Sequence, residues 1–326
     1  MASQFNWKVS FTVHNVRLAS GSISAEGMEI DLHPKSDKDL PRVRVSYRFG
    51  TPASSPTIGQ QAKETIERFL ACGDVEWALL GWDVRTVVED FDLELENWRE
   101  LSAQGKNPPP KFSATFRNTA TWNKDSVSRA WDWSKKVACH ADEEPIFRIL
   151  RLLRHSMVEE DEYDRFSKVW RAFNAFYNHL AGGPRSSERS RIDNFGKSLI
   201  ATNSKWLTSA IQGYWTPKSS IEHYLDFVIA NRGWNSVMDC LIKQGFADNQ
   251  GVNHSETLAA AVSTQQIARA LESALLCLYC ERNRVMHGET ISDSERDLLY
   301  VCALFLQRIV AIALNEFYFI PIKESA

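Results

Sequence analysis

The first part of the chain alternates apolar and polar residues with a period of two. Such alternation predicts strands that bury one face and expose the other to water. Residues 1–125 are therefore expected to form a mostly antiparallel sheet, as a sandwich or a half-barrel, covered by one helix over residues 59–71. Four segments carry the alternation: residues 5–13, 42–49, 90–96 and 111–116.

Beyond residue 140 the apolar residues recur at the period of a helix. An aromatic stripe, Phe166, Trp170, Phe173 and Tyr177, marks the clearest of these helices. The last helix is expected to run from Ser292 to about Phe319, because Ser292 and Glu295 have the spacing of a capping box. The expected segments are residues 143–157, 161–180, 219–231, 263–283 and 292–319.

The predicted fold class is α+β, with an N-terminal mostly antiparallel β domain and a C-terminal all-α helical bundle. We expect the β domain over residues 1–125, a connector over 126–144 and the bundle over 145–326. A length of 326 residues, with 44% hydrophobic and 24% charged residues, suits two globular domains rather than a disordered chain.

Charge and cysteine content narrow the function classes. A net charge of −3 argues against general affinity for nucleic acid duplexes, so any RNA binding needs a local basic patch. The six cysteines show no spaced disulfide framework, which favours a reducing, cytoplasmic setting. The N-terminus has no pattern of a signal peptide. The apolar residues 301–314 are interrupted by Gln307 and Arg308 and are too short for a membrane span, so no membrane association is expected.

Candidate chemistry lies between the last two predicted helices, in residues 281–290 (ERNRVMHGET). Arg282 and Asn283 precede His287 and Gly288, with four residues between the Arg and the His. This pattern resembles the signature of the HEPN superfamily, in which an Arg, often followed by a polar residue such as Asn, precedes a His with four to six residues between them. The aromatic helix upstream also resembles the first helix of the bundle in bacterial abortive-infection and ApeA-like HEPN ribonucleases.

The resemblance covers roughly residues 145–320 and implies a metal-independent endoribonuclease that needs no cofactor. It implies Arg282, His287 and Asn283 as catalytic residues, and a homodimer formed through the HEPN bundle. It also implies a role in phage defence, toxin–antitoxin pairing or stress response, with RNA (tRNA among the candidates) as substrate and an antitoxin or a phage-derived trigger as regulator.

The residue types suit this chemistry independently of the family. Histidine is the natural general acid or base near neutral pH, and an arginine can hold two phosphate oxygens as charge develops on them. A 2′-OH that attacks the adjacent phosphorus makes RNA the expected substrate and leaves a 2′,3′-cyclic phosphate and a 5′-OH. In an unbroken helix Arg282 and His287 would lie about 140° apart, so a helix end at Gly288 or a second subunit is expected to bring them together.

Two alternatives stay open for the bundle and one for the β domain. Arg and His at the end of a helix also offset its dipole, and the bundle would then be a non-catalytic module that binds RNA, a nucleotide or a protein. A metal-dependent small-molecule enzyme would instead use the acidic strand around Asp92 and Glu94. The Cys277-x-x-Cys280 pair has no second ligand pair for zinc, and core packing is the favoured reading.

Five further residues are candidates for RNA contact. Arg284 lies inside the motif, and Asn174 is the polar residue of the aromatic helix best suited to reach the site. The remaining three recur every third residue along one predicted helix and could follow a phosphate backbone, although a solvated helix face is the commoner role for such a row. They are Arg148, Arg151 and Arg154.

Overall fold

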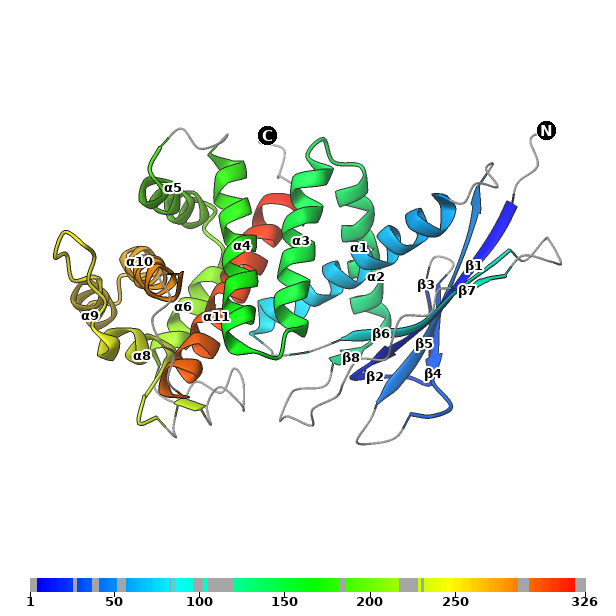
Figure 1. Ribbon diagram of the computed structural model, residues 1–326, viewed down its shortest axis with the longest axis horizontal. Helices are drawn as coiled ribbons and strands as arrows, with labels where there is room; N and C mark the ends of the chain where they lie inside the picture. Colours follow the sequence, from blue (N-terminus) through cyan, green and yellow to red (C-terminus); the bar gives the residue numbers. More distant parts are fainter. Residues whose placement is uncertain are drawn as a thin grey trace. The chain divides into compact units, whose positions relative to one another are not determined.

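The structure is a computed structural model that describes residues 5–25, 28–36, 41–51, 57–81, 84, 86–95, 102–104, 120–181, 186–216, 228–229, 232–286 and 293–319. The chain divides into two compact units. Unit 1 comprises Met1–Trp77 and Val84–Cys139, and unit 2 comprises Ala78–Asp83 and His140–Ala326. Strands gather in unit 1 and helices in unit 2 (Figure 1), which confirms the predicted α+β class.

A six-stranded antiparallel sheet forms unit 1, in the order β3-β4-β5-β1-β6-β7. A short parallel pair, β2 with β8, lies outside it. The described strands form one sheet with a separate pair, rather than the expected sandwich or half-barrel, and the segment 111–116 lies outside the described residues. The strands are β1 (Phe5–His14), β2 (Val16–Leu18), β3 (Ser22–Ala25), β4 (Met28–Leu32), β5 (Arg42–Thr51), β6 (Val87–Leu95), β7 (Ser102–Gln104) and β8 (Ala120–Trp122).

The central strand β1 is buried on both faces. Its predicted core residues Val9, Phe11 and Val13 are at most 2% exposed, as expected from the alternation. The intervening Thr12 and His14, predicted to face water, are also buried. Strand β1 pairs with β5 on one side and β6 on the other, so neighbouring side chains shield its polar face as well.

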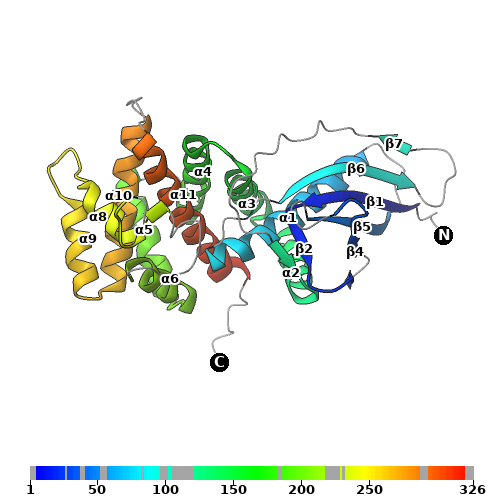
Figure 2. The ribbon, with the colours of Figure 1, turned by 90° about the horizontal axis from the view of Figure 1, so that it is seen from below.

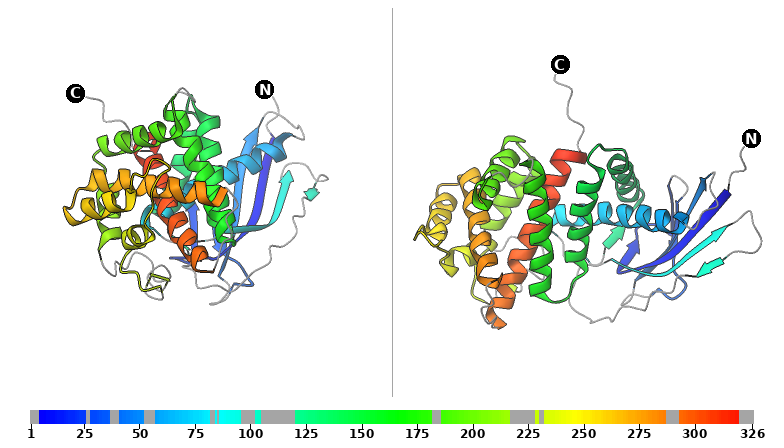
Figure 3. Two further views of the ribbon diagram at one scale, coloured as in Figure 1. Left: turned by 60° about the vertical axis from the view of Figure 1, so that its left-hand side comes forward. Right: turned by 45° about the horizontal axis from the view of Figure 1, so that its top comes forward.

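Two helices, not the one expected, lie on one side of the sheet: α1 (Thr57–Leu80) and α2 (Lys124–Ala138) (Figures 1 and 3). The ring of Trp131 in α2 lies 4.8 Å from that of Tyr47 in β5 and 5.8 Å from that of Phe69 in α1. Most of the expected connector 126–144 is therefore helix α2, which begins after the N-cap Asn123. The units divide at Cys139, so the bundle begins close to the predicted residue 145.

Local sequence signals begin the helices of unit 2. The N-cap side chains of Asp161, Ser187, Ser204, Ser236 and Asn253 each accept a hydrogen bond from the backbone N–H three residues later. The helices are α3 (Glu143–Val158), α4 (Glu162–Leu180), α5 (Glu188–Ala201), α6 (Lys205–Trp215), α8 (Val237–Gln244), α9 (His254–Ser263), α10 (Ile267–Met286) and α11 (Asp293–Leu314), which continues as the π-helical turn η1 (Asn315–Phe319).

Helix α11 is the core of unit 2. It lies between α3 and α4 on one side and α6 and α10 on the other (Figures 1, 2 and 3). The helical segment Glu295–Phe319 is long and apolar enough to cross a membrane, but 94% of its most apolar window is buried inside the protein. Burial of this kind is what the central helix of a folded bundle requires.

Several polar residues of this core form hydrogen bonds inside the protein. Gln307 of α11 donates to Ser156 Oγ (3.0 Å), and that hydroxyl donates to the Leu153 carbonyl (2.6 Å). Arg165 of α4, 1% exposed, donates to the carbonyls of Ser156 (3.2 Å) and Met157 (3.1 Å) in the last turn of α3. The buried guanidinium thus meets the negative end of a helix dipole and occupies carbonyls that the helix itself cannot use.

Candidate functional site

The predicted motif lies at the end of α10. Arg282, Asn283 and Arg284 occupy its last turns, and the helix ends at Met286. His287 and Gly288 lie outside the described residues. The helix end expected at Gly288 also lies outside the described residues, so the described part of the motif is its cationic and amide part.

The Arg282 side chain is held in place with its charge only partly balanced. Its guanidinium lies 5.9 Å from the ring centre of Trp170, and its Nη1 donates to Asn283 Oδ1 at 2.8 Å. The nearest carboxylate oxygen, on Glu188, is 3.6 Å from the same nitrogen. The buried Nε has no hydrogen-bond partner among the described residues. The side chain is 26% exposed, and a guanidinium with only one long ion pair keeps capacity for an anion on its exposed part, whereas the buried Nε is out of reach of a ligand.

A buried tyrosine fixes the carboxylate that faces Arg282. Tyr177 of α4 is 0% exposed and donates its hydroxyl to Glu188 at 2.6 Å. Burial, and then the adjacent carboxylate, raises the pKa of Tyr177 well above its usual range. Glu188 lies in the first turn of α5, after the N-cap Ser187, so its position is set by local capping and by Tyr177. The sequence analysis missed Glu188; its only sequence signal is the N-cap before it.

Arg284 is differently placed from Arg282. It makes a bidentate pair with Glu281, which is 0% exposed, at 3.0 Å for both contacts, and a second ion pair with Glu295 of α11. Hydrogen bonds and the charges of these carboxylates raise the pKa of Arg284. The two carboxylates balance its charge, so Arg284 joins α10 to α11 and is poorly suited to the RNA contact expected of it.

Asn283 faces a cavity of about 560 Å³. Arg189, Tyr279 and Cys280 also line this cavity, together with the loop of residues 244–250. Arg189 is paired with Asp248, whose pKa is lowered by the backbone N–H of Val252 and by other donors. The cavity therefore offers an amide, an aromatic ring and backbone groups, but its two arginines, Arg189 and Arg284, are both already paired with carboxylates.

The Cys277 and Cys280 thiols belong to this part of α10. Cys277 is 0% exposed, and burial raises the pKa of its thiol to about 12 and that of Cys280 to about 11. Among the described residues there is no group of three or more His, Cys, Asp or Glu that could hold a metal ion. The side chains of Asp92 and Glu94 lie outside the described part of the chain.

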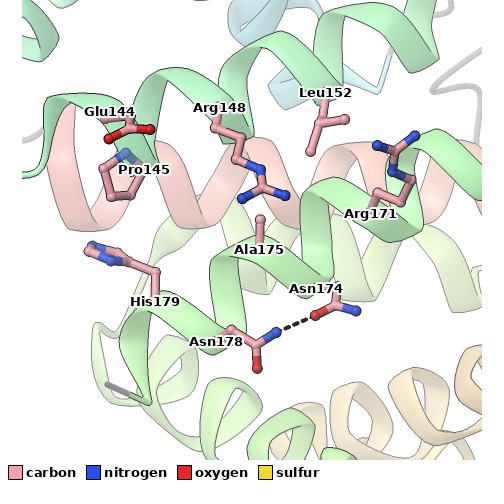
Figure 4. A pocket seen from close by; sticks show the side chains of 9 residues that line it. All are labelled: Glu144, Pro145, Arg148, Leu152, Arg171, Asn174, Ala175, Asn178 and His179. Carbon is pink, nitrogen blue, oxygen red and sulfur yellow. Dashed lines mark hydrogen bonds between the residues drawn. The ribbon is translucent and has the colours of Figure 1, made fainter. Parts of the chain in front are cut away.

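A second cavity, also of about 560 Å³, lies between α3 and α4 and brings together two predicted RNA contacts, Arg148 and Asn174. Figure 4 shows both side chains directed into it. Arg151 and Arg154 do not line it, and the Arg151 guanidinium instead lies 4.7 Å from the ring centre of Phe147. Residues three apart on a helix point in directions that differ by about 60°. Three arginines with this spacing therefore cannot all line one groove.

Comparison with protein-family models, with curated proteins and with solved structures finds no match for this chain.

Proposed function

We propose that this protein is a metal-independent endoribonuclease that acts in the cytoplasm, in phage defence, toxin–antitoxin pairing or a stress response. The observation that carries the proposal is the position of Arg282 and the incomplete balance of its charge. Its guanidinium lies at the end of α10 against the face of Trp170, is 26% exposed and has only one long ion pair, so its charge is incompletely balanced. Five residues along the chain is His287, the residue type that moves protons near neutral pH.

In the proposed reaction the 2′-OH of one nucleotide attacks the adjacent phosphorus and the 5′-oxygen of the next nucleotide leaves. His287 moves a proton, either from the attacking hydroxyl or to the leaving oxygen. Arg282 donates hydrogen bonds to the phosphate oxygens as their charge grows. Asn283, which already accepts a hydrogen bond from Arg282, orients the guanidinium. The products are a 2′,3′-cyclic phosphate and a 5′-OH.

A non-catalytic binding module is the second candidate, and specific contacts favour it. Glu188 faces Arg282, and Glu281 and Glu295 balance Arg284. Such pairs stabilise the end of α10 without any substrate. In that case the bundle would bind RNA, a nucleotide or a protein, and the motif would only maintain its shape.

Cleavage of labelled total RNA and tRNA in EDTA tests the proposal. We expect the wild-type protein to cut RNA and leave cyclic-phosphate ends, and His287→Ala to be inactive, because His287 is assigned the proton transfer. Gel analysis after phosphatase and kinase treatment identifies the ends. Wild-type protein that cuts no better than a folded His287→Ala variant would leave the binding module as the better account.

We further propose that the active form is a homodimer joined through the helical bundle. The bundle would then place the motifs of two chains next to each other. The Arg282 of one chain could face the His287 of the other, whereas residues five apart on one helix point in different directions. Analytical ultracentrifugation should give about twice the monomer mass at micromolar concentration. In a cleavage assay, a mixture of Arg282→Ala and His287→Ala chains should regain part of the activity if each site takes residues from both chains. A monomer with full activity would contradict this arrangement.

A further inference from the structure

The groove between α3 and α4 presents an unusual charge distribution. Arg148 of α3 and Arg171 of α4 both line it, and neither guanidinium has an ion-pair or hydrogen-bond partner in the described part of the chain. By contrast, Arg165 on the same helix as Arg171 and Arg284 at the end of α10 are both engaged by the protein. Two unengaged cations that face one cavity from different helices favour a bound anion.

The amide side chains of the groove are arranged to add a donor. Asn178 donates from Nδ2 to Asn174 Oδ1, which fixes the Asn174 amide. Figure 4 shows the Asn174 Nδ2 group turned toward the end of the groove where Arg171 lies. The groove therefore combines two guanidinium forks and an oriented N–H₂ group, the donor types that bind phosphate oxygens.

The opposite end of the groove has a different chemistry. Glu144 lies in the first turn of α3 and His179 near the end of α4, and both line this end, away from Arg171 (Figure 4). The His179 Nε2 is 3.6 Å from a carboxylate oxygen of Asp142. A carboxylate here can accept hydrogen bonds from sugar hydroxyls, whereas it would repel a second phosphate. The groove thus separates a phosphate-binding end from a hydroxyl-binding end.

We infer that this groove is a ribonucleotide-binding site, in which Arg148, Arg171 and Asn174 hold a phosphate and Glu144 accepts from ribose hydroxyls. The site is independent of the proposed cleavage, because none of its lining residues belongs to α10. The phosphate belongs either to a free nucleotide or to one nucleotide of a single-stranded RNA. Both present the same group to the arginines, and binding measurements distinguish them.

The test uses the full-length chain carrying His287→Ala, so that cleavage cannot consume the probe. ADP binding is measured by calorimetry and the binding of a short fluorescein-labelled single-stranded RNA by anisotropy. Arg148→Gln and Arg171→Gln are each expected to weaken binding about tenfold, the effect of losing one charge-assisted hydrogen bond. Arg151→Gln is the matched control, since Arg151 is an exposed arginine of the same helix outside the groove, and it should change binding less than about twofold.

The outcomes separate the sources and the alternatives. If ADP binds and competes with RNA, the ligand is a free nucleotide. If RNA binds and ADP does not, the groove holds a phosphate of the strand. Either result supports the site provided that the two groove variants lose affinity and Arg151→Gln does not. Absence of binding by both probes at millimolar ADP and micromolar RNA, or equal losses in all three variants, would overturn it. If the wild-type protein fails to cleave RNA, the conclusion about this groove does not change, because the binding measurements do not depend on cleavage.

Discussion

Replacing Arg282 with alanine is expected to lower the rate of RNA cleavage by about 100- to 1000-fold, the usual effect of removing one preorganised donor to a developing oxyanion. The guanidinium is already positioned by Trp170 and Asn283, so its loss removes a donor that needs no rearrangement. The stability cost should be only about 1 kcal/mol, because the ion pair to Glu188 is long and partly solvated. Single-turnover cleavage and thermal unfolding measure the two effects.

Two further variants, Glu188→Gln and Arg282→Lys, test whether Arg282 acts on the phosphate or only stabilises the fold. If Arg282 acts on the phosphate, Glu188→Gln should retain most of the activity, since a glutamine carbonyl still accepts from Tyr177. Arg282→Lys should lose most of it, because an ammonium cannot bind two oxygens as a planar fork does. Equal losses in Arg282→Ala and Glu188→Gln would show instead that the pair is structural, as the binding-module reading requires.

Arg165→Ala is expected to destabilise unit 2 by about 3–5 kcal/mol. The substitution leaves the carbonyls of Ser156 and Met157 in the last turn of α3 without their donor and opens a cavity against the ring of Tyr300. The unfolding midpoint, followed by helical circular dichroism, should fall by about 10 °C.

Two control variants separate the causes of this loss. Arg171→Ala changes an exposed arginine on the same helix and should shift stability by less than about 0.5 kcal/mol. Arg165→Met keeps most of the side-chain volume but donates no hydrogen bond. Stability close to the wild type in Arg165→Met would assign the loss to the cavity, and stability close to Arg165→Ala would assign it to the carbonyls. Equal effects of Arg165→Ala and Arg171→Ala would contradict the role described for the buried guanidinium.

Those elements that could be predicted have local signals, whereas α2, α5, α6, α8 and α9 were not predicted. The alternation of residues 5–13 predicted β1, and the helical period with Ser292 predicted the start of the last helix to within one residue of Asp293. The sequence did not reveal that the polar face of β1 is also buried. A strand's period shows which residues share a face, whereas the number of neighbours on each side depends on the order of strands in the sheet.

The candidate site was predicted in part. The sequence placed Arg282 and Asn283 at a helix end and marked Asn174 and Arg148 as RNA contacts, and the structure brings the last two into one groove. Nothing in the sequence indicated that Glu188 faces Arg282. Arg171 was not singled out because it looks like any exposed residue of an amphipathic helix.

By itself, the sequence determined the class of each half, several of its elements and the residue types at the end of α10. Only the tertiary structure decided which arginines remain available to a ligand. Arg284 and Arg165 are occupied by partners on other helices, Arg282 has only one long ion pair to Glu188, and Arg148 and Arg171 meet across a groove without a partner among the described residues. The physical reason is the distance along the chain over which each effect acts. Backbone periodicity and capping involve residues a few positions apart. Whether an arginine is paired depends on carboxylates and carbonyls that folding brings from distant parts of the chain.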